Sequence, residues 1–251
     1  MNCILLLESD LDSDRRAVIK GARAEKLIQQ HDLKDSLEIT IAVYDRGLGK
    51  GIIKIHNKEL LEISVSLLKE PPPREEVELI IAFQRPQTVK KILQISASYG
   101  IRKIHFIKTE NSQKSYMQSK VLSETAIRDQ FTLGLQQSLD CIFPQVEFHK
   151  QYKDFLYFAE GYLKDSAKQT ALKLTADVYC DMPPVRSVLQ LRGSKQLVFL
   201  ALGPESGWSS REREDFLNLG FTLYSLGQRT YRTEIALAML LGQIALLRQN
   251  L

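Results

Sequence analysis

Gly203-Pro204-Glu205-Ser206-Gly207 and Leu226-Gly227-Gln228-Arg229-Thr230-Tyr231-Arg232-Thr233-Glu234 are the two stretches that decide the fold of this chain. The first follows an apolar run typical of a buried strand, and the second opens a long apolar helix. Glycines let a backbone approach a ligand closely and leave its N–H and C=O groups free. Charges placed where a chain leaves a buried strand need partners or a ligand. Together the two junctions predict one ligand pocket.

Each stretch also has a simpler interpretation. A Gly-Pro-Glu-x-Gly run is usually only a tight turn, and Ser209-Ser210-Arg211-Glu212 has the spacing of a capping box for a following helix. At the second junction, the charges of Arg229, Arg232 and Glu234 can pair with one another.

Upstream of these junctions, strands and helices alternate. Strands are predicted over 77–83, 103–108, 196–202 and 221–226, and helices over 88–99, 124–139 and 233–248. This pattern predicts a parallel sheet covered on both faces, with 196–202 near its centre. The last helix is apolar almost all round, so a second surface, best supplied by a second subunit, must cover its outer flank.

A different pattern precedes Pro71-Pro72-Pro73, which cannot join a sheet ladder and so marks a domain boundary. Alternating residues over 37–44, 51–56 and 61–67 predict half-buried antiparallel strands in a small β-barrel or sandwich. We therefore predict domains over 1–70 and 74–251. The run Arg46-Gly47-Leu48-Gly49-Lys50-Gly51 lacks the helix that a dinucleotide loop needs, so a hairpin turn is predicted, with RNA contact by Arg46 or Lys50 the less favoured alternative.

Composition places the chain among ordinary globular proteins, with 251 residues of which 44% are hydrophobic and 25% charged. The first residues predict a strand and not a signal peptide, and no apolar run is long enough for a membrane span. Three cysteines without CxxC spacing argue against a zinc ribbon or a disulfide framework. Four histidines fall in different predicted elements without ligand spacing: His31, His56, His105 and His149. We predict a cytoplasmic protein without metal or membrane contact.

Positive charge gathers in the segment 85–128. Nine basic residues stand there against two acidic ones, a local excess of seven charges, with aromatic rings among them. Phosphates attract such charge and unpaired bases stack on aromatic rings, so the segment suits RNA. A solvated positive face explains the same pattern equally well.

At the two opening stretches, the chain resembles the bacterial 16S rRNA (uracil1498-N3)-methyltransferase family of the SPOUT superfamily. That family carries a Gly-Pro-Glu-Gly-Gly turn and a Leu-Gly-x-Arg-x-Leu-Arg-Thr-Glu-Thr-Ala run at the same separation and the same distance from the C-terminus. In outline the resemblance covers the whole chain. It implies an α/β fold: an N-terminal PUA-like β-barrel, then a SPOUT α/β domain with a C-terminal trefoil knot. It also implies a homodimer, bent S-adenosylmethionine in the knot, and 16S rRNA or the small ribosomal subunit as partner.

The resemblance also assigns roles by position. It implies cofactor contacts from seven residues: Leu202, Gly203, Glu205, Gly207, Leu226, Gly227 and Tyr231. The loop after Thr170-Ala171-Leu172-Lys173-Leu174 is a further candidate wall. Arg229 is implied in RNA binding, and Arg85 and Lys114 are RNA candidates from the basic segment. Arg232 and Glu234 are the catalytic candidates, because an arginine stabilises negative charge on the uracil oxygens and a carboxylate accepts the N3 proton.

Departures from the family pattern fall in two groups. Near the cofactor, Ser206, Gln228, Tyr231 and Ile235 replace glycine, proline, leucine and threonine. On the expected substrate side, the charges of three family elements are missing or changed at 94–101, 109–111 and 136–140. Two alternatives therefore stay open: a methyltransferase of this fold acting on another RNA site, or a catalytically silent RNA-binding or ribosome-assembly protein.

Overall fold

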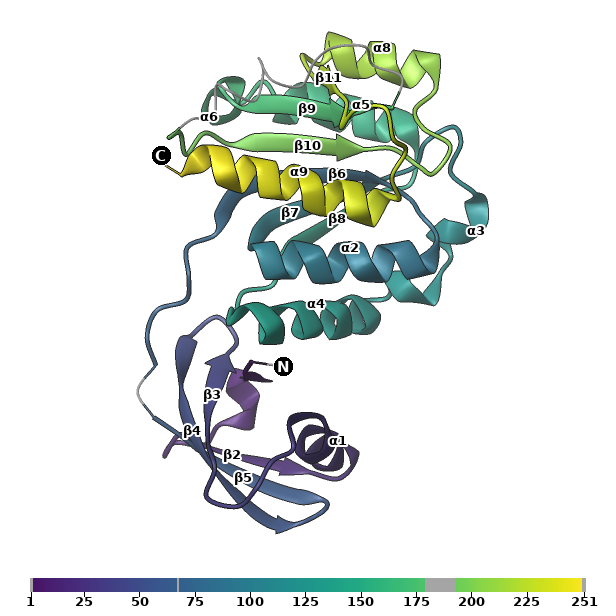
Figure 1. Cartoon of the computed structure of the whole chain (residues 1–251). Helices are drawn as coiled ribbons and strands as arrows, with labels where there is room; N and C mark the ends of the chain where they lie inside the picture. The colour runs from purple at the N-terminus through teal and green to yellow at the C-terminus, as the bar shows by residue number, and fades with distance from the viewer. Residues whose placement is uncertain (1, 67, 179–192, 250–251) are drawn as a thin grey trace. The chain divides into compact units, whose positions relative to one another are not determined.

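The structure is a computed structural model that describes residues 2–66, 68–178 and 193–249 (Figure 1). The chain forms a mixed α/β fold of two compact units. The first contains 1–73, 96–100 and 128–143, and the second contains 74–95, 101–127 and 144–251. The first stretch of the first unit thus ends beside the three prolines, but two later segments join it. The domains 1–70 and 74–251 stay a prediction.

The first unit contains a curled five-stranded sheet (Figure 1). Its strands are β1 (Ile4–Leu6), β2 (Arg16–Lys20), β3 (Glu38–Val43), β4 (Gly47–Asn57) and β5 (Leu60–Val65), in the order β1-β3-β4-β5-β2. The predicted antiparallel pairing is confirmed for β3, β4 and β5, whereas β1 pairs with β3 in parallel. Strand β2 and helix α1 (Ala22–His31) were not predicted. Alternate side chains of the strands, such as Ile41, Ile53 and Ile63, fill the hydrophobic core of the first unit.

The predicted hairpin turn over 46–51 is largely wrong, because β4 already begins at Gly47. The glycines serve close strand packing instead. A Cβ on Gly47 would lie 1.8 Å from the Lys69 carbonyl oxygen, and one on Gly51 would lie 2.5 Å from the Ile41 side chain. Arg46 pairs with Glu8 in this unit, and Lys50 lies 3.6 Å from Glu38.

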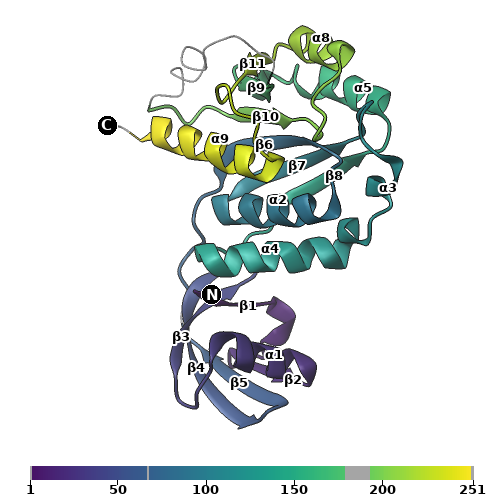
Figure 2. The same ribbon diagram turned by 45° about the vertical axis from the view of Figure 1, so that its right-hand side comes forward.

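The second unit is built on a six-stranded sheet (Figure 2). Its strands are β6 (Glu75–Ala82), β7 (Ile101–Ile107), β8 (Gln145–His149), β9 (Leu172–Ala176), β10 (Val198–Leu202) and β11 (Thr222–Tyr224). They run in the order β11-β9-β10-β6-β7-β8, and every pair is parallel. The predicted parallel sheet is confirmed, and β10 lies fully buried between β9 and β6 as expected.

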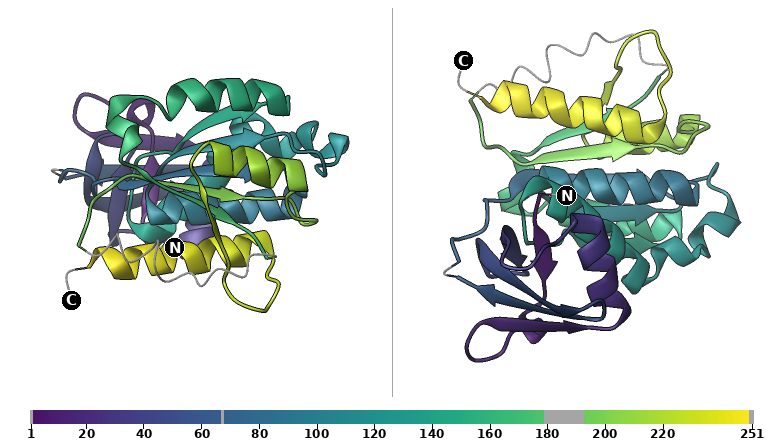
Figure 3. Two further views of the ribbon diagram at one scale, coloured as in Figure 1. Left: turned by 90° about the horizontal axis from the view of Figure 1, so that it is seen from above. Right: turned by 60° about the horizontal axis from the view of Figure 1, so that its bottom comes forward.

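Helices cover both faces of the parallel sheet (Figure 3). Helices α2 (Pro86–Tyr99) and α9 (Thr233–Arg248) lie on one face, while α5 (Tyr152–Tyr162) and α8 (Ser210–Asn218) lie on the other. The remaining helices are α3 (Lys114–Met117), α4 (Glu124–Ser138) and α6 (Ser166–Gln169), with short 3-10 turns over Glu8–Asp10 and Lys120–Leu122. The predicted capping box is confirmed at α8, where Ser209 and Glu212 bond each other's backbone.

Helix α9 buries only one flank within its own chain. Leu237, Leu240, Leu241 and Ile244 are buried. Ile235, Met239 and Leu246 are 46%, 37% and 54% exposed. The sequence prediction of an apolar outer flank is thus confirmed. Among the helices described, none has both the length and the apolar character to cross a membrane.

Candidate functional site

The carboxyl ends of β6, β9, β10 and β11 meet at one edge of the parallel sheet, since these four strands are neighbours. Gln84, just beyond β6, joins the two predicted junctions there. Its side chain is 1% exposed, donates to the Gly203 carbonyl oxygen at 2.6 Å and accepts from the Thr233 hydroxyl at 3.0 Å. The structure therefore brings both motifs together. Gln84 itself was not predicted, because a single amide after a strand carries no distinctive signal.

The first loop is held by Trp208, which sequence reasoning also missed. The buried indole donates from Nε1 to the Ala176 carbonyl oxygen at 3.0 Å. A Cβ on Gly203 would lie 3.1 Å from this ring. Leu202 ends β10 and is buried, and Gly207 adopts a φ of 78° that favours glycine. Both glycines thus fit the loop for steric reasons.

Two residues predicted for different roles lie together in this loop. The Arg85 backbone N–H donates to Glu205 at 3.3 Å, and its guanidinium Nε lies 3.6 Å from the same carboxylate. Arg85, predicted to contact RNA, and Glu205, predicted to contact a cofactor, therefore form one exposed pair. Lys114 begins α3 and is exposed.

The second loop is more open. Gly227 is exposed with a φ of 104°, and its N–H donates to the Ser225 hydroxyl at 3.1 Å. Leu226 and Tyr231 are half-buried. Arg229 and Arg232 are exposed, and no ion pair joins either one to another residue in the described part of the chain. Two exposed guanidinium groups without an ion-pair partner among the described residues therefore lie beside the meeting strand ends.

Glu234, in contrast, is buried in the first turn of α9. Its Oε1 lies 3.0 Å from Lys91 Nζ, and its Oε2 has no hydrogen-bond partner among the described residues. Burial by itself raises the pKa of Glu234, but the bond from its own backbone N–H and the nearby Lys91 and Arg232 outweigh burial, so the pKa lies below its ordinary value. The carboxylate is therefore ionised at neutral pH. Its partner is Lys91 and not the two arginines.

The candidate wall is the loop after 170–174, and strand β9 extends to Ala176 before this loop begins. Directly after β9, Asp177 is buried and pairs with Arg213 Nε at 2.6 Å. Residues 179–192 lie outside the described residues.

A cavity of about 320 Å³ lies beside the first loop and contains none of the predicted site residues. Lys108, Tyr152 and Arg211 are among its lining. Glu212 accepts from the Glu110 backbone N–H at 2.7 Å and thereby joins the cavity wall to the start of α8. The cavity places three cationic side chains next to the candidate site: Lys108, Lys153 and Arg211.

Much of the basic segment is neutralised within the fold. Its ion pairs are Arg85–Glu205, Lys91–Glu234, Arg102–Glu76 and Lys103–Glu147. Lys108 donates to the carbonyl oxygens of Thr109 and Ser112. The local charge excess counted along the sequence is therefore larger than the uncompensated charge in the fold.

Residues that depart from the family pattern over 136–140 make structural contacts in the first unit. The Gln136 carbonyl oxygen accepts from the backbone N–H groups of Asn2 and Cys3 at 3.0 and 3.1 Å. Asp140 Oδ1 accepts from the Cys141 and Ile142 N–H groups at 2.6 and 3.2 Å. The Asp140 side chain thus has a structural role, whereas Gln136 contributes its backbone carbonyl.

An all-parallel sheet with glycine-containing loops gathered at neighbouring carboxyl ends defines an α/β protein with a ligand site at that edge. The family follows from the RNA methyltransferase domain model, which matches residues 70–245. The chain belongs to this family, and the resemblance seen in the sequence is confirmed.

Relatives agree with this membership. A ribosomal RNA small subunit methyltransferase E from Treponema pallidum is 30% identical over 160 residues, which cover 64% of this chain and 58% of that protein. A ribosomal RNA small subunit methyltransferase E 1 from Borreliella burgdorferi is 23% identical over 87% of each chain. The matched part therefore spans less than two thirds of the Treponema relative's length.

Solved structures share the fold over nearly the whole chain. A ribosomal RNA small subunit methyltransferase E from Neisseria gonorrhoeae, bound to S-adenosylmethionine, aligns with a TM-score of 0.73 at 18% identity and covers 98% of both chains. A structure from Legionella pneumophila in complex with S-adenosylmethionine aligns with a TM-score of 0.69 at 16% identity, covering 98% of this chain and 97% of that one. At such identities the likeness concerns the fold.

Proposed function

We propose that this chain is an S-adenosylmethionine-dependent RNA methyltransferase that methylates N3 of uracil 1498 in 16S rRNA, with the small ribosomal subunit as its partner. Family membership and the activity named for its relatives support this function. Within the chain, the supporting observation is Gln84, whose buried amide holds the Gly203 loop and the start of α9 together.

The residues at this edge suit S-adenosylmethionine, which carries positive charge on its sulfonium and amino groups. The buried, ionised Glu234 has one carboxylate oxygen without a partner among the described residues. Such an oxygen favours a nearby cationic group. Leu202, Gly203, Glu205 and Gly207 would hold the cofactor from the first loop, and Leu226, Gly227 and Tyr231 from the second. When bound, the cofactor supplies an electrophilic methyl group.

The charge and position of each residue at this edge suggest its role in the reaction. Arg232 lies exposed at the N-cap of α9, where its guanidinium can stabilise the negative charge that develops on the uracil oxygens. Arg229, Arg85 and Lys114 would contact RNA phosphates. Glu234 would accept the N3 proton, and its lowered pKa keeps it in the basic, ionised form. The mechanism uses no metal ion, since the sulfonium is itself a good leaving group.

We extend the proposal to the architecture. The curled sheet of the first unit would be a PUA-like β-barrel over 1–70, and 74–251 a SPOUT domain with a C-terminal trefoil knot in a cytoplasmic homodimer. The exposed apolar flank of α9 supports the dimer. Met239→Glu should give a monomer in size-exclusion chromatography with light scattering. Leu217→Glu, an exposed apolar position on α8, should leave the dimer intact; a dimeric Met239→Glu protein would contradict this interface.

The test of function is methyl transfer from labelled S-adenosylmethionine to small ribosomal subunits, followed by mass spectrometry of the digested 16S rRNA. We expect one N3-methyluridine at position 1498. No transfer to any RNA, with RNA binding retained, would instead indicate a silent RNA-binding protein.

A second candidate function is methylation of another RNA site by the same machinery. The altered residues over 94–101 and 109–111 favour it, because charges of the family pattern on the expected substrate side are missing or changed there. Methyl transfer to total RNA at a position other than 1498 would establish this alternative.

A further inference from the structure

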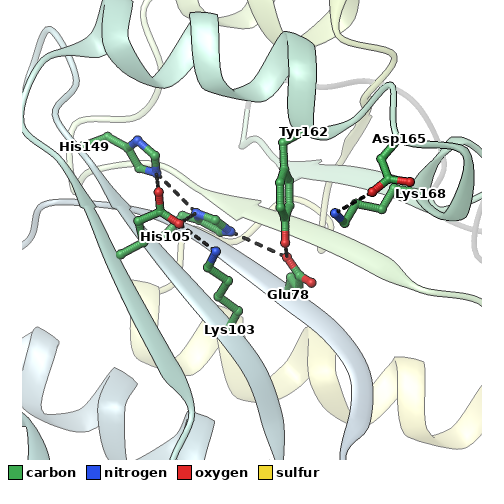
Figure 4. A network of polar contacts seen from close by, with 8 residues as sticks. Glu78, Lys103, His105, His149, Tyr162, Asp165 and Lys168 are labelled. Carbon is green, nitrogen blue, oxygen red and sulfur yellow. Dashed lines mark hydrogen bonds and ion pairs between the residues drawn. The ribbon is translucent and has the colours of Figure 1, made fainter.

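A second polar cluster lies on the α5 face of the parallel sheet, where β6, β7 and β8 run in parallel (Figure 4). His105 Nδ1 and His149 Nε2 are 3.2 Å apart. Glu147 Oε2 lies 3.7 Å from His105 Nδ1, and Glu147 Oε1 lies 3.9 Å from His149 Nε2. The proposed methyl transfer uses none of these groups.

This arrangement brings together two histidines that have no ligand spacing along the sequence. His149 ends β8 and His105 lies inside β7, and the two are 6% and 1% exposed. Because β7 and β8 are adjacent and parallel, with Ile107 opposite His149 and His105 opposite Glu147, their side chains on one face converge. Spacing along the sequence does not show this.

The three side chains lie near the separations of a tetrahedral metal site. A zinc ion bound at about 2.0–2.1 Å holds its ligand atoms about 3.4 Å apart. The two ring nitrogens are 3.2 Å apart, and each has a different Glu147 oxygen beside it, Oε2 at 3.7 Å from His105 and Oε1 at 3.9 Å from His149. With one ligand atom taken from each residue, all three lie within 4.8 Å of one another. A rotation of the Glu147 carboxylate that brings one oxygen toward both rings would complete the set of three ligand atoms.

Outer groups already orient one of these histidines. Glu78 Oε2 lies 3.5 Å from His105 Nε2, on the side of the ring away from the cluster. Tyr162 donates its hydroxyl to the same carboxylate at 2.9 Å. A carboxylate behind a histidine fixes the tautomer that leaves the other ring nitrogen free, a common arrangement at metal sites. Here it leaves Nδ1 facing His149 and Glu147.

The remaining charge and access are compatible with an ion. Lys103 Nζ binds Glu147 Oε2 at 2.6 Å, so the second carboxylate oxygen stays available. The two negative charges of Glu78 and Glu147 together exceed the single positive charge of Lys103. The Glu147 side chain is 36% exposed, which gives the cluster a route to solvent.

We propose that His105, Glu147 and His149 form a binding site for a divalent transition-metal ion, with zinc the preferred metal and water in the fourth position. Two imidazoles and one carboxylate are ligands that suit zinc, while magnesium and calcium prefer oxygen alone. The hydrogen between the two ring nitrogens moves to the outer nitrogen of His149 when the ion enters. This site is independent of the methyltransferase function.

The test is direct metal binding by the full-length protein after chelator treatment and dialysis. Titration with Zn²⁺ in a calorimeter should show one site per chain, and Co²⁺ should give the visible absorption of a tetrahedral complex. His149→Gln and Glu147→Gln should weaken binding by at least about 100-fold. Glu78→Gln should weaken it by about 10–100-fold, since it acts through His105.

His56→Gln is the matched control, because His56 also pairs with a glutamate, Glu62 at 3.0 Å, but on the exposed surface of the first unit. Its zinc affinity should equal that of the unchanged protein. Glu147 is partly exposed, so Glu147→Gln keeps the test valid if His149→Gln fails to fold. Absence of Zn²⁺ and Co²⁺ binding, or equal affinity in Glu147→Gln, would overturn the proposal.

Discussion

The two polar regions of the second unit differ in how they are built. The candidate methyl-transfer edge consists of contiguous loop motifs with exposed arginines that lack ion-pair partners among the described residues. The buried cluster takes residues from β6, β7, β8 and helix α5, and most of its polar groups contact one another. An exposed, unpaired charge contributes little to stability and is free to act on a ligand. A buried, paired group contributes to stability. Substitutions in the two regions should therefore affect different properties.

Arg232→Ala should show the largest effect, confined to activity. Loss of one group that stabilises developing negative charge costs about 10²–10³-fold in turnover, or about 3–4 kcal/mol. Because Arg232 is exposed, the free energy of unfolding should change by less than about 0.5 kcal/mol. Methyl-transfer kinetics and urea unfolding on the same preparation measure both.

Arg16→Ala provides its control, since Arg16 is an exposed arginine on β2 of the other unit. This variant should keep both turnover and stability. An Arg232→Ala protein that unfolds at lower urea concentration or aggregates would show that Arg232 is structural. The two regions would then not differ in the way proposed.

Tyr162→Phe should show the opposite behaviour. The Tyr162 hydroxyl donates to Glu78 at 2.9 Å, and Glu78 is 5% exposed, so removing the hydroxyl leaves a buried carboxylate with fewer partners. A hydrogen bond to a charged group contributes about 1.5–3 kcal/mol. Urea unfolding of the metal-free protein should show a loss of this size with normal methyl transfer.

Tyr157→Phe is the matched control on the same helix, because the Tyr157 side chain is 85% exposed. It should leave stability unchanged. Equal stability of Tyr162→Phe and the unchanged protein would mean that the buried cluster does not stabilise the fold.

The same contrast explains what the sequence predicts. The parallel sheet, its central strand β10 and helix α9 follow from periodicity, because long apolar patterns persist through each element. Both loop motifs stand out because their residues are consecutive. Gln84, Trp208 and His105 do not stand out in the sequence. Each has its role because of the order of the strands in the sheet, and local sequence patterns do not predict that order. Strands β2, β8 and β9 were missed because charged or polar residues interrupt their short runs, whereas the equally short β10 is apolar throughout.

Gly203→Ala tests whether the edge motif has structural as well as binding constraints. The new Cβ would lie 3.1 Å from the Trp208 ring, and the bond from Trp208 Nε1 to Ala176 holds that ring in place. Overpacking of this kind costs about 1–2 kcal/mol. Thermal unfolding monitored by the single tryptophan should detect the loss and a change in the indole's surroundings.

Gly161→Ala gives the comparison of opposite sign, because nothing lies within 4 Å of its Cβ position in helix α5. Alanine there should stabilise by about 0.5–1 kcal/mol. If Gly203→Ala did not lower the stability, the first loop would have room for a Cβ at position 203. The contact with Trp208 would then not constrain this position.

Lys91→Met should show the smallest effect and one that depends on pH. Lys91 is 54% exposed, so its pair with Glu234 contributes about 1 kcal/mol or less. The folded pKa of Glu234 lies below its ordinary value of 4.5, so the stabilisation is full above that value and is lost as the pH falls through the folded pKa. Urea unfolding should separate the two proteins at about pH 7, and the difference should shrink as the pH falls below 4.5.

Lys90→Met is the control, because Lys90 is an exposed neighbour on α2 without an ion pair in the described residues. It should match the unchanged protein at both pH values. A Lys91→Met difference that persists in acid would mean that the lost stability comes from packing of the lysine stem. The Glu234 carboxylate would then not depend on Lys91 for its charge, and its lowered pKa would be due to its own backbone N–H and to Arg232.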